Sequence, residues 1–160
     1  MQELRRFVPI GSKPAKRKLF LTKSAMRDLD DDYSATNSLC GRGFIQQALT
    51  HWTRGERVWE HNGKGEFLKR LDPPPPEIWE IRVTAPRPQA RLFGRFAEAD
   101  SLIVTKFHTR DFLKDKDSAN WETAINQCKN QWERLFPDFP PFVGTKIGEY
   151  VTENCDDYKI

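Results

Sequence analysis

The chain has 160 residues, which suits one domain, and 38% of them are hydrophobic, including 5 Trp and 11 Phe. This apolar content excludes an intrinsically disordered chain. No apolar run approaches the roughly 18 residues of a membrane-spanning helix, and charges interrupt the N-terminal stretch where a secretion signal needs an apolar core. The 3 cysteines lack metal-ligand spacing. We therefore expect a cytoplasmic protein with free thiols and no membrane partner.

The formal net charge of +3 conceals a gradient along the chain. Residues 1–53 carry 9 basic and 5 acidic side chains, residues 54–110 carry 11 and 8, and residues 111–160 carry 6 and 10. A basic body with an acidic last third predicts a local anion site rather than a general nucleic-acid coat. One hypothesis is that the acidic third folds over the basic part as an internal inhibitor.

The first half of the sequence predicts a flexible basic arm over residues 1–16 and then alternating structure. The expected elements are a strand over 17–22, a helix capped by Ser24, a loop over 34–43, a helix over 44–59 and a turn over 61–65. The proline run 73–76 excludes a helix and predicts a stiff, extended approach to the next strand.

The second half predicts three strands, a helix and an extension. Apolar runs mark strands over 77–83, 90–96 and 101–110, whose short connections favour antiparallel neighbours. An apolar stripe predicts a helix over 119–136 that packs on the core. Residues 137–160 show no clear periodicity and are expected to form a C-terminal extension. The fold class is therefore α+β, a small, mostly antiparallel sheet with helices packed on one face, in the order β-α-α-β-β-β-α.

Basic side chains are unusually frequent on the three predicted strands. They are Arg82, Arg91, Arg95, Lys106, His108 and Arg110. Strands rich in Ile, Val, Phe and Trp need no arginine for their own stability, and a buried guanidinium is costly unless it meets a carboxylate or a phosphate. An anionic ligand is thus expected, with RNA as the first candidate. Strand alternation places Arg91, Phe93 and Arg95 on one side, a pattern for phosphates and a base, or otherwise simply the solvated face of an amphipathic strand.

Three segments together resemble the RelE-like toxins of bacterial toxin–antitoxin systems, in particular the HigB and phage-derived branch. They are IWEIRV (78–83), ARLF (90–93) and LIVTKFHTRD (102–111). The resemblance covers about residues 16–136 and implies a RelE-like domain over 17–136. It also implies an endoribonuclease, an mRNA interferase that cleaves mRNA on the ribosome. Such enzymes use acid/base transesterification without a metal or other cofactor, and a small antitoxin protein neutralises them.

The same resemblance assigns roles to individual residues. Arg91 matches an arginine that contacts the scissile phosphate, and Arg110 lies near a second phosphate-binding arginine. His108 lies where some members place a general acid or base, and Glu80 lies near a carboxylate base. A neighbouring arginine is expected to lower the pKa of Glu80, which weakens it as a base and fits an ion pair across strands.

The sequence departs from the family at two points. Ile78 and Glu80 replace a lysine pair, and the tyrosine that stacks on the substrate base has only Phe107, Phe112 and Trp121 as substitutes. The alternative is therefore a catalytically inactive protein of the RelE/ParE fold that acts by binding, either as a gyrase-type inhibitor or as a regulatory module.

Further basic residues could bind RNA or could be ordinary solvated surface charges. The predicted RNA-binding residues are Arg82, Arg95, Lys106, Lys64, Lys69 and Arg70. The acidic run from Asp28 to Asp32 lacks the ligand order of a calcium loop, so no metal site is expected.

Overall fold

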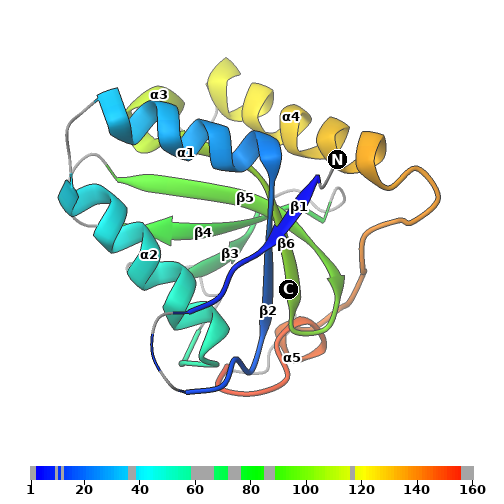
Figure 1. The fold of residues 1–160 in the computed structure, drawn as a ribbon. Helices are drawn as coiled ribbons and strands as arrows, with labels where there is room; N and C mark the ends of the chain where they lie inside the picture. Colours follow the sequence, from blue (N-terminus) through cyan, green and yellow to red (C-terminus); the bar gives the residue numbers. More distant parts are fainter. Residues whose placement is uncertain are drawn as a thin grey trace.

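The protein folds around one six-stranded mixed sheet with the strand order β1-β2-β6-β5-β4-β3 (Figure 1). The computed structural model describes residues 3–9, 11, 13–35, 39–58, 67–71, 77–84, 89–115 and 118–155, with the backbone alone for 31–35 and 39–41. The strands are β1 (Leu4–Arg6), β2 (Lys18–Thr22), β3 (Leu68–Arg70), β4 (Trp79–Val83), β5 (Ala90–Glu98) and β6 (Ser101–Thr109). β2 pairs with β6 in parallel, and the other neighbours are antiparallel.

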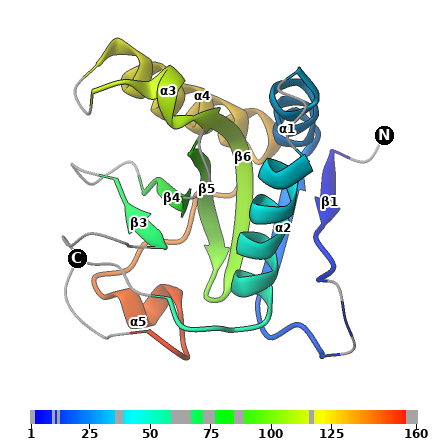
Figure 2. The ribbon, with the colours of Figure 1, turned by 90° about the vertical axis from the view of Figure 1, so that its left-hand side faces the viewer.

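Five helices accompany this sheet in the part of the chain that the structure describes. They are α1 (Lys23–Ala35), α2 (Leu39–Thr53), α3 (Arg110–Leu113), α4 (Ala119–Leu135) and α5 (Ile147–Tyr150). α1, α3 and α4 lie towards one end of the long strands and α5 towards the other (Figure 2). None of these helices has the length and apolar character needed to cross a membrane. The predicted α+β class and mostly antiparallel sheet are confirmed, whereas β1, β3, α3 and α5 are additions to the predicted order.

Helices cover both faces of the sheet, and not one face as predicted. On one face, Leu92 of β5 belongs to the main core together with Leu49 and Trp52 of α2. On the other face, Phe93 of β5 packs in a second cluster with Cys128 of α4. Because β5 has large apolar side chains on both sides, each side needs a helix to exclude water.

The helix ends differ from the prediction more than the helix bodies do. Thr22, and not Ser24, caps α1, because the Thr22 Oγ1 accepts a hydrogen bond from the backbone N–H of Ala25 at 3.1 Å. α2 starts inside the predicted loop and stops short of the predicted end at 59. Gly55 follows it with a φ of +73°, a left-handed conformation that glycine adopts readily. α4 agrees with the predicted helix to within one residue.

Both segments predicted to lie outside the domain contribute to it where they are described. β1, in the expected flexible arm, pairs with β2. Ile147, Tyr150 and Val151, in the expected extension, are buried in the main core. The Tyr150 hydroxyl donates a hydrogen bond to the buried carboxylate of Glu77. The predicted boundaries therefore do not separate independent pieces. The hydrophobic spacing of α5 was missed because one helical turn is too short to show a period.

The described part of the acidic last third packs on both faces of the sheet. Ile147, Tyr150 and Val151 join the main core, on the face of the sheet opposite Phe93, whereas Leu113, Ala124 and Cys128 pack in the cluster of Phe93. Arg91 shares the side of β5 that carries Phe93, since the two residues are separated by one position. The core residues of the extension therefore lie on the side opposite Arg91, whereas α4 of the same acidic third packs on the Arg91 side, and the internal inhibitor stays a hypothesis.

Candidate functional site

Arg82, Arg91 and His108 form one row across β4, β5 and β6. Arg82 is the register partner of Arg91, and Arg91 is the register partner of His108. Directly opposite residues in antiparallel strands have Cβ atoms about 5 Å apart and point to the same side. The structure therefore brings together three of the predicted site residues on the α4 side of the sheet.

Arg91 of this row also forms a buried ion pair with Glu80 of β4. Arg91 is only 2% exposed and Glu80 only 3%. The Arg91 Nε lies 3.8 Å from Glu80 Oε2, and the Arg82 Nε lies 3.6 Å from Glu80 Oε1. The Nη1 of Arg91 also donates to the backbone carbonyl of Ala90 at 2.9 Å. Arg91 is thus enclosed by its own strand and by Glu80, while Arg82 remains partly exposed.

Burial controls the ionisation of this pair. It raises the pKa of Glu80, and the charges of Arg91, Arg82, Lys69 and Arg110 oppose that shift. The direction is the reverse of the predicted lowering, because removal of the carboxylate from water outweighs the attraction of the cations. Burial also lowers the pKa of Arg91 to about 10, with Glu80 opposing. The Oε2 of Glu80 accepts no hydrogen bond from the described residues, so nearby cations are its main support.

His108 is held between a helix and an aromatic ring. Its Nε2 lies 2.9 Å from the Oε1 of Gln127 on α4. The Phe112 ring stacks on it, with centroids 4.4 Å apart and an interplanar angle of 12°. α3 starts directly after β6, where the Thr109 Oγ1 accepts a hydrogen bond from the backbone N–H of Phe112 at 3.3 Å. This strand-to-helix junction fixes the position of the imidazole, and the sequence offered no signal that would have selected Gln127.

Arg110 completes the group of cations. Its guanidinium carbon lies 5.7 Å from the centroid of the Trp121 ring, a cation–π geometry. Its charge lowers the pKa of both Glu80 and Arg91, so it belongs to the same electrostatic group. Since Arg110 is partly exposed, it can meet a ligand from solvent.

The three substitutes for the base-stacking tyrosine have different surroundings. Phe107 is buried in the main core, on the other side of the sheet, and therefore cannot reach a base at this site. Trp121 is partly buried and packs edge-on against Phe93. Phe112 is 41% exposed and parallel to His108, which makes it the available stacking surface.

Several predicted RNA-binding residues serve the interior instead. Phe93 is fully buried, so the expected pattern of two arginines flanking a base-stacking ring is wrong. Arg95 is buried under α4, with its guanidinium carbon 5.8 Å from the centroid of the Trp132 ring. Arg70 is buried and forms an ion pair with Glu77. Strand alternation correctly placed Phe93 and Arg95 on one side of β5, but only the packing of α4 shows that this side is covered.

The three predicted lysines have separate positions. Lys69 is the register partner of Glu80 at the β3 edge of the sheet. Lys106 is largely buried, and its Nζ lies 2.9 Å from the Oδ2 of Asp28 on α1. Lys64 lies outside the described residues, as do the predicted turn around it and the proline run 73–76.

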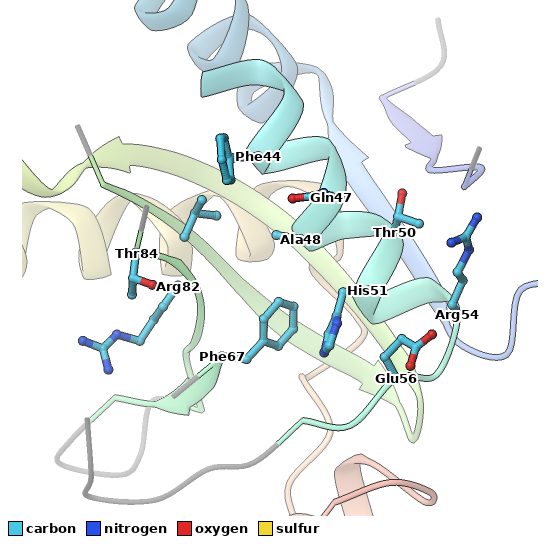
Figure 3. A pocket seen from close by; sticks show the side chains of 11 residues that line it. Phe44, Gln47, Ala48, Thr50, His51, Arg54, Glu56, Phe67, Arg82 and Thr84 are labelled. Atoms are coloured by element: carbon cyan, nitrogen blue, oxygen red, sulfur yellow. The ribbon is translucent and has the colours of Figure 1, made fainter. Parts of the chain in front are cut away.

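A hollow of about 510 Å³ lies beside α2, and His108 is not among its lining residues (Figure 3). Phe44, His51 and Phe67 give it an aromatic wall. The His51 Nε2 is already 2.7 Å from the backbone carbonyl of Arg57. Arg82 reaches the rim of this hollow, with its guanidinium pointing away from His51. Polar side chains, among them Gln47, Arg54 and Glu56, also line this hollow, but apart from Arg82 none of its residues belongs to the predicted site, and we assign it no chemistry.

Two negative findings complete the description. Within the described ranges, no three His, Cys, Asp or Glu side chains gather closely enough to hold a metal ion. Comparison with models of protein families, with curated proteins and with solved structures gave no significant match to any of them.

Proposed function

We propose that the protein is a toxin-like endoribonuclease that binds mRNA at the Arg82–His108–Arg110 surface and cleaves it, on the ribosome, until an antitoxin protein neutralises it. The observation that supports this most strongly is the row Arg82–Arg91–His108, with Arg110 beside it. A sheet gains no stability from several cations side by side, whereas a phosphodiester needs them.

Each side chain that reaches solvent has its own role in the proposed reaction. Arg82 and Arg110 bind the phosphate oxygens, and the stacked Phe112 supports the adjacent base. The ribose 2′-hydroxyl attacks the phosphorus, the bond to the 5′-oxygen breaks, and a 2′,3′-cyclic phosphate and a 5′-hydroxyl result. His108 takes the proton from the 2′-hydroxyl and returns it to the departing 5′-oxygen. Arg91 contributes its positive charge without contacting the phosphate, since its burial and its ion pair with Glu80 keep it from the surface.

A second candidate is a protein of the same fold that binds without cleaving. Two observations favour it. The expected phosphate ligand Arg91 is enclosed, and the Nε2 of His108 is already engaged by Gln127. A gyrase-type inhibitor or a regulatory module needs the surface but no proton transfer.

Induction in a bacterial host separates the two candidates. Wild type is compared with His108→Ala, Arg110→Ala and, as a control, Arg42→Ala, an exposed arginine on α2. Growth and primer extension on an abundant mRNA are measured. For an mRNA interferase, wild type and the control arrest growth and produce new in-frame cuts, which both site variants lose. Arrest without cuts supports the gyrase-type inhibitor. Normal growth with folded protein supports the regulatory module.

A further inference from the structure

A second, polar hollow lies beside His108, on the far side of Gln127. It has a volume of about 280 Å³ between the start of α1 and α4. Its lining residues are Ser24, Lys106, Gln127, Asn130, Gln131 and Arg134. Pockets that hold small molecules start at about 300 Å³, so this hollow suits a group no larger than one nucleotide.

The lining of this hollow is cationic and rich in amides. Residues 127, 130, 131 and 134 share one face of α4, because their spacing follows the helical repeat. Side-chain amides offer both donors and acceptors, as the edges of nucleobases do. No carboxylate is among the described lining residues. Lys106 is paired with Asp28, and Arg134 is paired with Glu3 at 3.9 Å and donates a hydrogen bond to the Gln131 Oε1 at 3.3 Å.

The hollow is connected to the proposed cleavage site in two ways. Gln127 lines the hollow and also lies 2.9 Å from the imidazole of His108. In addition, Lys106 and His108 are separated by one position in β6 and pair with Phe93 and Arg91, which share one side of β5. A strand of RNA that crosses His108 therefore meets this hollow next.

We infer that this hollow is a subsite for one nucleotide that flanks the scissile phosphate in single-stranded RNA. Lys106 and Arg134 bind its phosphate, and Asn130 and Gln131 read the edge of its base. This inference rests on the proposed function and deepens it, because it assigns base preference to α4. Single-stranded RNA fits best, since its bases are free to leave the stack and offer their edges.

Fluorescence anisotropy with labelled 2′-O-methyl decamers of A, C and U tests the subsite, since these probes bind without being cleaved. The variant is Asn130→Ala/Gln131→Ala. The control is Asn126→Ala, an exposed amide on α4 that does not line the hollow. Wild type and the control should prefer one decamer. The double variant should bind that decamer about tenfold more weakly, because two hydrogen bonds to the base are lost, and should show no preference.

Two further variants distinguish failure of the subsite from failure of the proposed function. Arg110→Ala should weaken binding of all three decamers equally. Arg134→Ala, an exposed position that tolerates truncation, should weaken binding and reduce the salt slope by about 1. If Arg110→Ala weakens binding while the α4 variants match wild type, the subsite alone is refuted. Equal binding of the decamers by wild type refutes base reading. If wild type binds none of them, the proposed function fails as well.

Discussion

Arg91 of β5 lies directly opposite His108 of β6, yet only the histidine reaches the surface. The guanidinium is turned into an ion pair with Glu80, and the imidazole is stacked under Phe112. One register position therefore joins an interior charge to a partly exposed proton carrier. The interior pair governs stability, and the exposed groups govern any chemistry on a ligand.

Arg91→Ala should lower the free energy of unfolding by about 3–5 kcal/mol, because Glu80 would remain buried without the buried counter-charge of Arg91. Urea denaturation measures this. Arg82→Ala serves as the control, since Arg82 is partly exposed and should cost less. The double variant Arg91→Ala/Glu80→Gln should recover part of the loss. A loss below about 0.5 kcal/mol in Arg91→Ala would show that the pair contributes nothing.

Glu80→Gln should remove a pH dependence of stability. Because the pKa of Glu80 is raised in the folded protein, the folded state binds the proton more tightly than the unfolded chain. The resulting stability is full below the unfolded value of 4.5 and is lost as pH rises through the folded pKa. The free energy of unfolding of wild type relative to Glu80→Gln should therefore fall with rising pH. A constant difference between pH 4 and 8 would contradict the shift.

Tyr150→Phe should destabilise the protein by about 1–3 kcal/mol, because the buried carboxylate of Glu77 loses a hydrogen-bond donor. Burial and the bond to Glu77 also raise the pKa of Tyr150 to about 12 from an ordinary 10.0. The stability that this shift provides is full below pH 10 and is lost as pH rises through about 12. Circular dichroism should show that the variant lacks this alkaline loss. An unchanged alkaline profile would refute the role of the hydroxyl.

Gly94→Ala should lower the free energy of unfolding by about 1–3 kcal/mol, because a methyl group would clash with the backbone carbonyl of Ile103 across the β5–β6 irregularity. Gly43→Ala is the matched control, since Gly43 lies inside α2 with nothing within 4 Å of the added carbon. That change should stabilise the protein by about 0.5–1 kcal/mol. Thermal unfolding of the two variants should thus shift in opposite directions, and a shared direction would exclude this account of Gly94.

Local patterns in the sequence predicted the long elements and failed where distant packing decides. The apolar stripe of α4 identified that helix, and apolar runs identified β4, β5 and β6. β1 and β3 have 3 residues each, which is too short for alternation to be visible. Alternation also put Arg91 and Arg95 on one side of β5, but only tertiary contacts show that both are covered, Arg95 by α4 and Arg91 by Glu80. Gln127 was unpredictable, because an amide on a helix acquires a role only from its neighbour.

The parallel pairing of β2 with β6 has a consequence for how the chain folds. The hydroxyl of Thr22, at the end of β2, donates a hydrogen bond to the backbone carbonyl of Thr105, which lies 83 positions later. β2 is an inner strand between β1 and β6, so its second edge stays unpaired until β6 has been synthesised. Closing so long a loop costs conformational entropy before the strand contacts that offset this cost have formed, and parallel pairing is intrinsically slow. During synthesis, the nascent chain therefore carries an apolar strand with an unpaired edge, which makes this interval the period of greatest exposure to chaperones and to aggregation.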